Sequence, residues 1–247
     1  MFLNISKHGL KTQVRTFRFK ATWLSLSVFL VAFLMLIGLG QWQIQRAQTK
    51  HNMIQHYQLS AHQHPKSLSE LFKTSALKQY TPVEASGAFD WAHMILLDHQ
   101  YHRHQLGYHV IVPFKPKAQL DPVLVNLGWV HRSFDFKHYA QPKRSQTIQG
   151  QIYFVSPNPF ITHTIPDKND FPLVIQGLEI EKLSSKINQP FQPFIIRLDA
   201  KAPLGFERDW KPVVLSPSRH IFYAVQFFLF AFIALMIFVY IHSERTS

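Results

Sequence analysis

The sequence contains no cysteine. This absence excludes disulfide bonds, thiolate metal sites, covalent c-type haem attachment and cysteine nucleophiles. Glycine is scarce as well, with nine residues in the whole chain, and neither a phosphate-binding glycine loop nor a G-x-G-x-x-G string occurs. A G-x-S-x-G nucleophile elbow and an H-E-x-x-H zinc-protease motif are also missing. The sequence therefore predicts a protein that is not an enzyme.

Charged residues are absent from two long apolar segments, at 21–40 and 221–241. Because an α-helix rises about 1.5 Å per residue, each segment is long enough to cross a hydrocarbon core of about 30 Å. We therefore expect transmembrane helices over residues 21–40 and 220–241. A cleaved signal peptide is the alternative for the first segment. It is disfavoured because the apolar stretch is longer than a signal h-region and no small-x-small site follows Gly40.

Acidic residues are absent from the first twenty positions, which hold Lys7, Lys11, Arg15, Arg18 and Lys20. Short basic flanks stay in the cytoplasm, so the tails at 1–20 and 242–247 are predicted to be cytoplasmic. The domain at 41–219 then lies in a bacterial periplasm or an equivalent space such as the mitochondrial intermembrane space. The predicted location is the bacterial inner (plasma) membrane. The formal net charge of +12 favours membrane lipid or acidic partners, and we expect no nucleic-acid partner.

The domain between the apolar segments carries a β-like pattern. Runs rich in Val, Ile, Leu and aromatic residues predict strands at 81–89, 93–98, 108–114, 123–130, 147–155, 173–178 and 194–198. Their close spacing favours antiparallel hairpins. We therefore expect a membrane protein with two transmembrane α-helices flanking a β-rich α+β extracytoplasmic domain, built as an antiparallel sheet or a partly open barrel.

Helices and loops complete the expected domain. No glycine or proline occurs from 41 to 64, which predicts that the first helix continues beyond the membrane surface. A short helix is expected over 67–72, where Ser67 and Glu70 form a capping-box pattern, and another over 179–187. Pro157 and Pro159 are expected to begin an irregular stretch, and 202–218 an extended loop.

Histidine is abundant, with fifteen residues. One group, His99, His102, His104 and His109, is close enough in sequence to suggest a zinc, copper or nickel site. Arg103 lies inside the group, however, and a cation between the ligands would oppose a metal ion. A polar hairpin tip is the simpler interpretation. A second group, at 51–64, has no metal-protease spacing and is interpreted as solvated.

His220 lies at the outer end of the second apolar segment. An imidazole there could bind a buried prosthetic group from the side while staying near water, and ionisable groups at membrane helices are functional candidates. Tyr223, Ala224 and Phe227 follow at helical spacing and extend the same face. Gln226 could hydrogen-bond to another helix.

Three strings together resemble the surfeit-locus-one family of cytochrome c oxidase assembly factors, in its bacterial form. The matching residues, in their order along the chain, are Gly40, Trp42, Gln43, Arg46, Gly107, Tyr108, Gly128, Trp129, His220, Tyr223, Ala224 and Gln226. The resemblance covers nearly the whole chain, including the two-span layout. Each string is weak alone, and their order and spacing make the match specific.

The resemblance implies an assembly factor for a haem-copper (cytochrome c) oxidase that binds haem a and delivers it to, or stabilises, the catalytic subunit. His220 maps to the proposed iron ligand. The other residues expected to contact the cofactor are Trp42, Arg46, Arg219 and Tyr223, with a basic outer edge that includes Lys211. The implied partners are the oxidase catalytic subunit and a haem a synthase.

Three departures and two alternatives accompany this interpretation. The residue before the key histidine is often asparagine or another polar residue in the family, and here it is Arg219. The family usually has arginine where this chain has Leu127, and Arg132 or Arg219 is the candidate substitute. Proline is common in the family at the position of His131. The first alternative function is a cofactor-free scaffold for oxidase subunits. The second is metal delivery by the four histidines between 99 and 109.

Overall fold

The computed structural model describes residues 17–136, 139, 141, 144–156, 165–166, 170–212 and 215–245. Most of the expected basic tail, at 1–16, and the expected irregular stretch beginning at Pro157 and Pro159 lie outside the described residues. The chain divides into two compact units. One comprises Met1–Met53 with Val213–Ser247, and the other comprises Ile54–Pro212.

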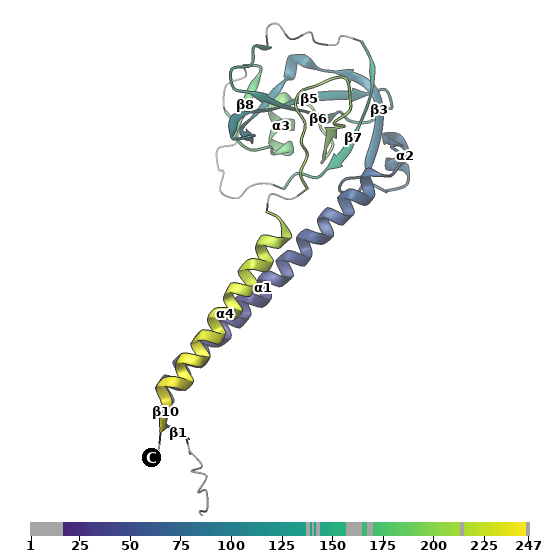
Figure 1. Ribbon diagram of the computed structural model, residues 1–247. Coiled ribbons are helices and arrows are strands. Elements are labelled where there is room, and N and C mark those ends of the chain that lie inside the picture. The colour runs from purple at the N-terminus through teal and green to yellow at the C-terminus, as the bar shows by residue number, and fades with distance from the viewer. Residues whose placement is uncertain are drawn as a thin grey trace, which may run out of the picture. The chain divides into compact units, whose positions relative to one another are not determined.

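The first unit is built on two long helices, α1 (Trp23–Ala61) and α4 (Pro217–His242). Both are long and apolar enough to cross a membrane, and they lie side by side (Figure 1). Strands β1 (Phe17–Phe19) and β10 (Ser243–Arg245) pair antiparallel at one end. As predicted, α1 continues well beyond its apolar segment, because its polar second half contains no helix breaker.

Small residues allow α1 and α4 to approach each other closely. Ala224 and Ala231 are almost fully buried on α4. A Cβ atom at Gly40 would lie 2.5 Å from the Phe228 ring, so glycine there leaves room for that ring. Further along the pair, Phe29 stacks on Phe238 with ring centroids 4.2 Å apart. Close packing of this kind drives helix association where lipid removes the hydrophobic advantage of burial.

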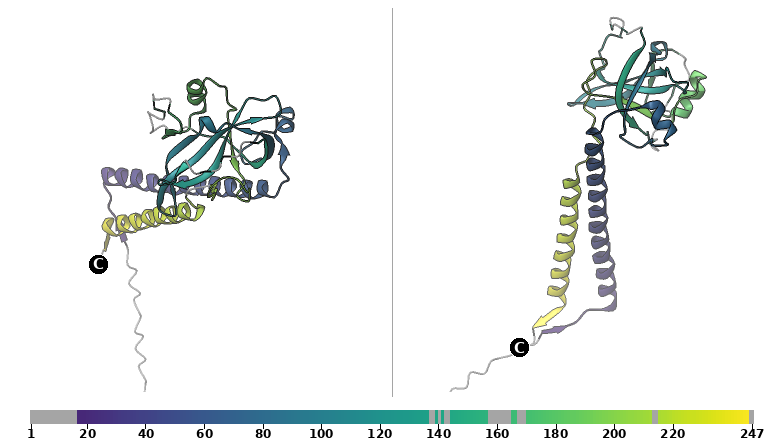
Figure 2. Two further views of the ribbon diagram at one scale, coloured as in Figure 1. Left: turned by 90° about the horizontal axis from the view of Figure 1, so that it is seen from above. Right: turned by 90° about the vertical axis from the view of Figure 1, so that its right-hand side faces the viewer.

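The second unit contains an eight-stranded sheet in which five strands close into a ring. The ring strands are, in order around it, β3 (Pro82–Phe89), β7 (Gln146–Tyr153), β9 (Ile195–Leu198), β6 (Val123–His131) and β5 (Gln105–Pro116). Closure comes from a second pairing of β3, whose last residues meet the end of β5 at Gly87↔Pro116. The domain is thus a small closed β-barrel, seen from two further directions in Figure 2.

Three strands extend this ring. β4 (Ile95–His102) forms a hairpin with β5, β8 (Leu173–Ile175) pairs with β4, and β2 (Lys66–Ser67) pairs with β3. The expected β-rich α+β domain between two apolar helices is confirmed. The sheet is mixed rather than wholly antiparallel, because β2–β3, β4–β8 and β6–β9 pair in parallel. These parallel pairs join strands with long intervening segments, as parallel pairing requires.

Strand β6 is buried on both faces, from Val123 to Val130. Alternate residues contribute to two separate clusters, since side chains of a strand point to opposite faces. Val125 and Leu127 belong to the larger core together with Phe114 and Ile196. Leu124 belongs to a second cluster that is completed by residues of β4, β8 and the helix α3 (Ile180–Ile187). Burial on both faces makes β6 the central strand of the domain.

The short helix α2 (Leu68–Lys73) forms where predicted, with the 3₁₀ turn η1 (Trp91–His93) following β3. The capping box predicted for α2 is wrong. Ser67 precedes the helix but makes no side-chain cap hydrogen bond, and its hydroxyl instead lies 2.8 Å from that of Ser69. Burial of Leu68 and Leu71 in the larger core anchors the helix in place of the cap.

Candidate functional site

The most unusual polar group of the helix pair is the imidazole of His220, in the first turns of α4. Its Nδ1 atom lies 2.8 Å from the Oε1 atom of Gln43 on α1. A side-chain amide oxygen only accepts hydrogen bonds, so Nδ1 carries the proton and donates it. The lone pair of the neutral ring is then on Nε2. That atom is buried and has no hydrogen-bond partner among the residues that the structure describes.

A buried acceptor without a partner costs about 1–3 kcal/mol, so this one calls for an explanation. An imidazole with its Nδ1–H held by an acceptor and its Nε2 lone pair open is the arrangement of a metal-ligating histidine. Within the described ranges, no group of three or more His, Asp or Glu residues could hold a metal ion. A single imidazole of this kind could ligate a metal that takes one protein ligand, as haem iron can.

The other residues expected around the cofactor lie apart from this hydrogen bond. Trp42 is half exposed on α1, and the guanidinium carbon of Arg46 lies 5.7 Å from its ring centroid. Arg219 and Tyr223 are exposed on α4. In the described part of the chain, no hydrogen bond, ion pair or ring contact joins Arg219 or Tyr223 to His220. The structure thus brings together His220 and Gln43, whose partnership the sequence did not indicate.

Four residues of the resemblance form a packing unit in the barrel. A Cβ atom at Gly107 would lie 2.6 Å from the Trp129 indole, so this glycine makes room for that ring. The indole Nε1–H donates to the backbone oxygen of Gln100 at 2.8 Å, and the Trp129 backbone N–H donates to that of Glu207 at 2.7 Å. Gly128 has a φ of +117°, and Tyr108 pairs with Val130 across the same strands. Gly107, Gly128 and Trp129 therefore shape the β5–β6 pair.

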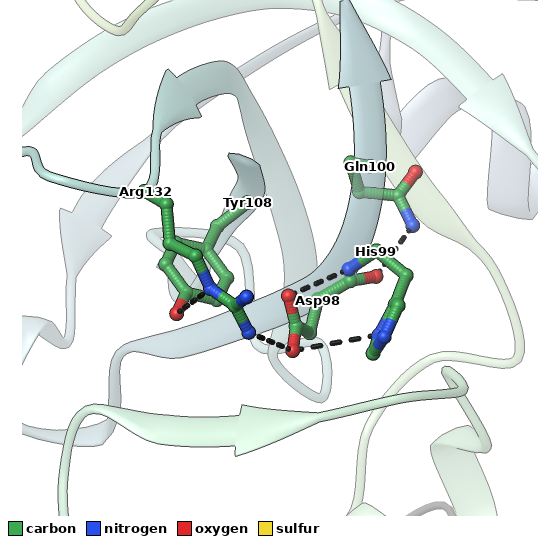
Figure 3. Close-up of polar contacts among 5 residues, drawn as sticks. All are labelled: Asp98, His99, Gln100, Tyr108 and Arg132. Atoms are coloured by element: carbon green, nitrogen blue, oxygen red, sulfur yellow. Dashed lines mark hydrogen bonds and ion pairs between the residues drawn. The ribbon is translucent and has the colours of Figure 1, made fainter. Parts of the chain in front are cut away.

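A buried carboxylate lies beside this unit, at the bulge in β4 (Figure 3). Asp98 accepts from the guanidinium Nη2 of Arg132 at 3.1 Å and from the backbone N–H of His99 at 2.7 Å. Arg132 also donates to the Tyr108 hydroxyl at 3.2 Å. Leu127 is fully buried in the barrel core. Arg132 thus pairs with Asp98. It does not take the position of the arginine that the family usually has where this chain has Leu127.

The four histidines between 99 and 109 take different partners. Arg103 and His104 form a two-residue hairpin loop with positive φ at both positions, which confirms the predicted hairpin tip. His102 pairs with Glu207 at 3.0 Å, and His99 lies 3.4 Å from Asp98. His109 is largely buried against Trp210.

Burial of His109 predicts a measurable dependence of stability on pH. Desolvation, with smaller contributions from Arg197 and His102, lowers the pKa of His109 from 6.5 to about 4. Between these two pKa values the unfolded chain binds a proton at His109 that the folded chain does not. The contribution of His109 to the free energy of unfolding is therefore fully present above pH 6.5 and is lost as the pH falls towards 4. The loss attributable to His109 should be about 3 kcal/mol.

Denaturant unfolding of the purified chain at pH 7 and at pH 4.5 measures this loss. The His109→Gln variant should show a smaller decrease in stability between the two pH values than the parent. His104→Gln, at the exposed loop, is the matched control and should leave the decrease unchanged. An equal decrease in the parent and in His109→Gln would contradict the prediction.

The structure defines a class: a membrane protein with two apolar helices, a closed β-barrel between them in the chain, and a helix histidine whose buried Nε2 atom has no hydrogen-bond partner in the described residues. The model of the SURF1 family matches residues 30–232, which is most of the chain. The chain therefore belongs to the SURF1 family, and its general role is in oxidase assembly. Among curated proteins, none matches the chain.

Proposed function

We propose that this protein binds haem a and delivers it to the catalytic subunit of a haem-copper oxidase, or stabilises that subunit while the haem is inserted. The observation that carries the proposal is the buried Nε2 atom of His220, which has no partner in the described residues. Haem a is the cargo here, so its release matters as much as its capture. His220 would be the one protein ligand described here for the iron, and binding through a single side chain would favour release of the haem to its acceptor.

The surroundings of His220 suit the rest of the cargo. Haem a combines a farnesyl tail with two propionates. The apolar faces of α1 and α4, which are exposed along most of their length, offer lipid-like surroundings for the tail. Arg46 and Arg219 are exposed cations for the propionates. Lys211, the third cation expected from the sequence, belongs to the other unit and forms an ion pair with Asp209 at 3.0 Å.

The proposed setting is the bacterial inner membrane, with both termini in the cytoplasm and the barrel in the periplasm. The proposed partners are the oxidase catalytic subunit, a haem a synthase and membrane lipid. Lys and Arg in the first twenty residues support this orientation. Protease accessibility of a tag in the barrel, measured in spheroplasts and in inverted vesicles, tests it directly.

Visible absorption spectroscopy tests the function. Protein purified in detergent from cells that make haem a should carry the spectrum of that haem. Deleting the protein should lower the amount of haem-replete oxidase while leaving the level of the apo-subunit intact. Purified protein without haem, together with loss of the apo-subunit itself, would instead establish the cofactor-free scaffold.

Gln43 should act as a positioning residue for His220. The Gln43→Leu variant removes the acceptor of the Nδ1 proton and should weaken haem a binding by about 10–100-fold. Gln43→Glu retains an acceptor and should bind haem. Its charge makes the imidazole more electron-donating, so the reduction potential of the bound iron should fall. Haem titration and potentiometry measure these effects.

Gln45→Leu is the matched control, since Gln45 is an exposed glutamine two positions away on α1. It should bind haem as the parent does. A reduction potential that stays the same in Gln43→Glu would show that Gln43 has only a structural role.

A further inference from the structure

A second candidate site lies in the barrel unit, which holds a cavity of about 440 Å³. Its walls come from the β4–β5 hairpin, from β6 and β9, and from the segment at 207–211. The volume is in the range that small-molecule sites occupy. His220 and the other described residues of the helix pair do not line this cavity, so the site does not depend on the proposed function.

Arg197 on β9 contributes the most unusual group of this cavity. Its guanidinium is largely buried and stacks on Tyr153, with the central carbon 3.3 Å from the ring centroid. The Nε atom is buried without a hydrogen-bond partner in the described residues. Burial lowers the pKa of Arg197, and the neighbouring tyrosine Tyr153 offsets part of that effect. A largely buried cation without a carboxylate partner favours an anion that offsets its charge.

The carboxylates of the cavity already have partners. Glu207 lies 3.0 Å from the Nε2 atom of His102, and Asp209 lies 3.0 Å from the ammonium of Lys211. Among the described residues, no carboxylate lies within ion-pair distance of Arg197. A bound anion would supply the charge partner that these residues do not give to Arg197.

Aromatic rings form part of the remaining walls, and the N–H groups of the two indoles already have partners. The indole N–H of Trp210 donates to the backbone oxygen of Leu198 at 2.8 Å, and that of Trp129 donates to Gln100 at the same distance. The ring of His109 meets Trp210 edge to face, with centroids 5.5 Å apart. Rings fixed in this way present flat apolar surfaces and demand no polar group from a ligand.

We propose that this cavity is a binding site for a small aromatic carboxylate, with Arg197 as the anion partner and the indoles of Trp129 and Trp210 as walls. A planar guanidinium that stacks on one face keeps its in-plane N–H donors, which match the two oxygens of a carboxylate. An aromatic body on the same molecule would use the ring surfaces that the cavity offers. The carboxylate and the ring together define the ligand class.

Isothermal titration calorimetry of the full-length chain in detergent tests the site with 2-naphthoate and its neutral isostere 2-naphthamide as probes. Naphthoate should bind with a Kd of about 1 mM or below, as expected for a fragment of this size. The amide should bind at least about tenfold more weakly, because it lacks the charge-assisted pair. Inorganic phosphate has no aromatic body and should bind more weakly than naphthoate. Equal binding of naphthoate and naphthamide, or of naphthoate and phosphate, would overturn the proposal.

Variants test whether Arg197 causes the preference for naphthoate over naphthamide. Arg197→Gln should remove the preference for naphthoate over naphthamide, while Arg103→Gln, an exposed cation of the same cavity, should change it less than about threefold. Arg197→Lys keeps the charge without the planar fork and should retain part of the preference. Equal losses in Arg197→Gln and Arg103→Gln would show general charge attraction and overturn the proposal. The comparison of probes on the parent protein stands even if a variant fails to fold.

Discussion

Replacing His220 with alanine should remove haem a from the purified protein. The imidazole offers the open nitrogen that would ligate the iron, and we expect the haem content per polypeptide to fall at least about tenfold. The measurement is the visible spectrum of protein purified from cells that make haem a. His220 and Gln43 both belong to the helix-pair unit, so we expect the barrel to stay folded in this variant, which circular dichroism checks.

Two controls separate ligation from structural damage. His242→Ala removes the other histidine of α4, at the far end of the helix, and should leave haem content unchanged. His220→Gly with added imidazole should recover the spectrum, because free imidazole can fill the vacated space and ligate iron. Equal haem occupancy in the parent and in His220→Ala would remove His220 from the mechanism and require another haem ligand.

Replacing Gly128 with alanine should destabilise the barrel strongly. The φ of +117° at this position is one that side chains with a Cβ atom rarely adopt. The new Cβ would also lie 2.6 Å from the backbone oxygen of Glu207, which cannot move without breaking its bond to Trp129. Strain of this kind costs about 1–3 kcal/mol, and the clash adds to it.

Thermal unfolding followed by circular dichroism measures the effect. A loss of about 3 kcal/mol should lower the midpoint by about 6–12 °C for a domain of this size. Gly38→Ala is the matched control, because a Cβ at Gly38 meets nothing within 4 Å. It should leave the midpoint unchanged. A Gly128→Ala protein that unfolds at the parent temperature would contradict the assignment of Gly128 to a required backbone conformation.

The sequence predicted the elements of this fold well and their assembly less well. Uncharged apolar segments mark α1 and α4, and β-branched runs mark the strands, because both signals depend on local side-chain chemistry. Ring closure was not predictable, because it depends on a pairing of β3 with the end of β5 that leaves no trace in local composition. The parallel pairing of β6 with β9 joins Val125 to Ile196, far apart in the chain.

The candidate sites likewise could be predicted from local sequence signals but not where they depend on tertiary contacts. His220 stood out from its position beside an apolar segment, whereas its partner Gln43 lies 177 residues away and appeared only as one letter of a motif. Arg197 was not identified at all. An arginine between Ile196 and Leu198 has the alternating pattern of a solvent-facing strand residue, and its burial follows from the rings of Tyr153 and Trp210 that the tertiary fold places against it.

The position of β9 in the barrel determines when the barrel can fold during synthesis. β9 is the last ring strand in the chain, and it is inserted between β6 and β7, which are synthesised much earlier. Until it arrives, both neighbours present unpaired backbone edges, which are prone to mispairing. The barrel can therefore close only after nearly all of the polypeptide before α4 has emerged, so its folding is late and vulnerable to premature chain termination.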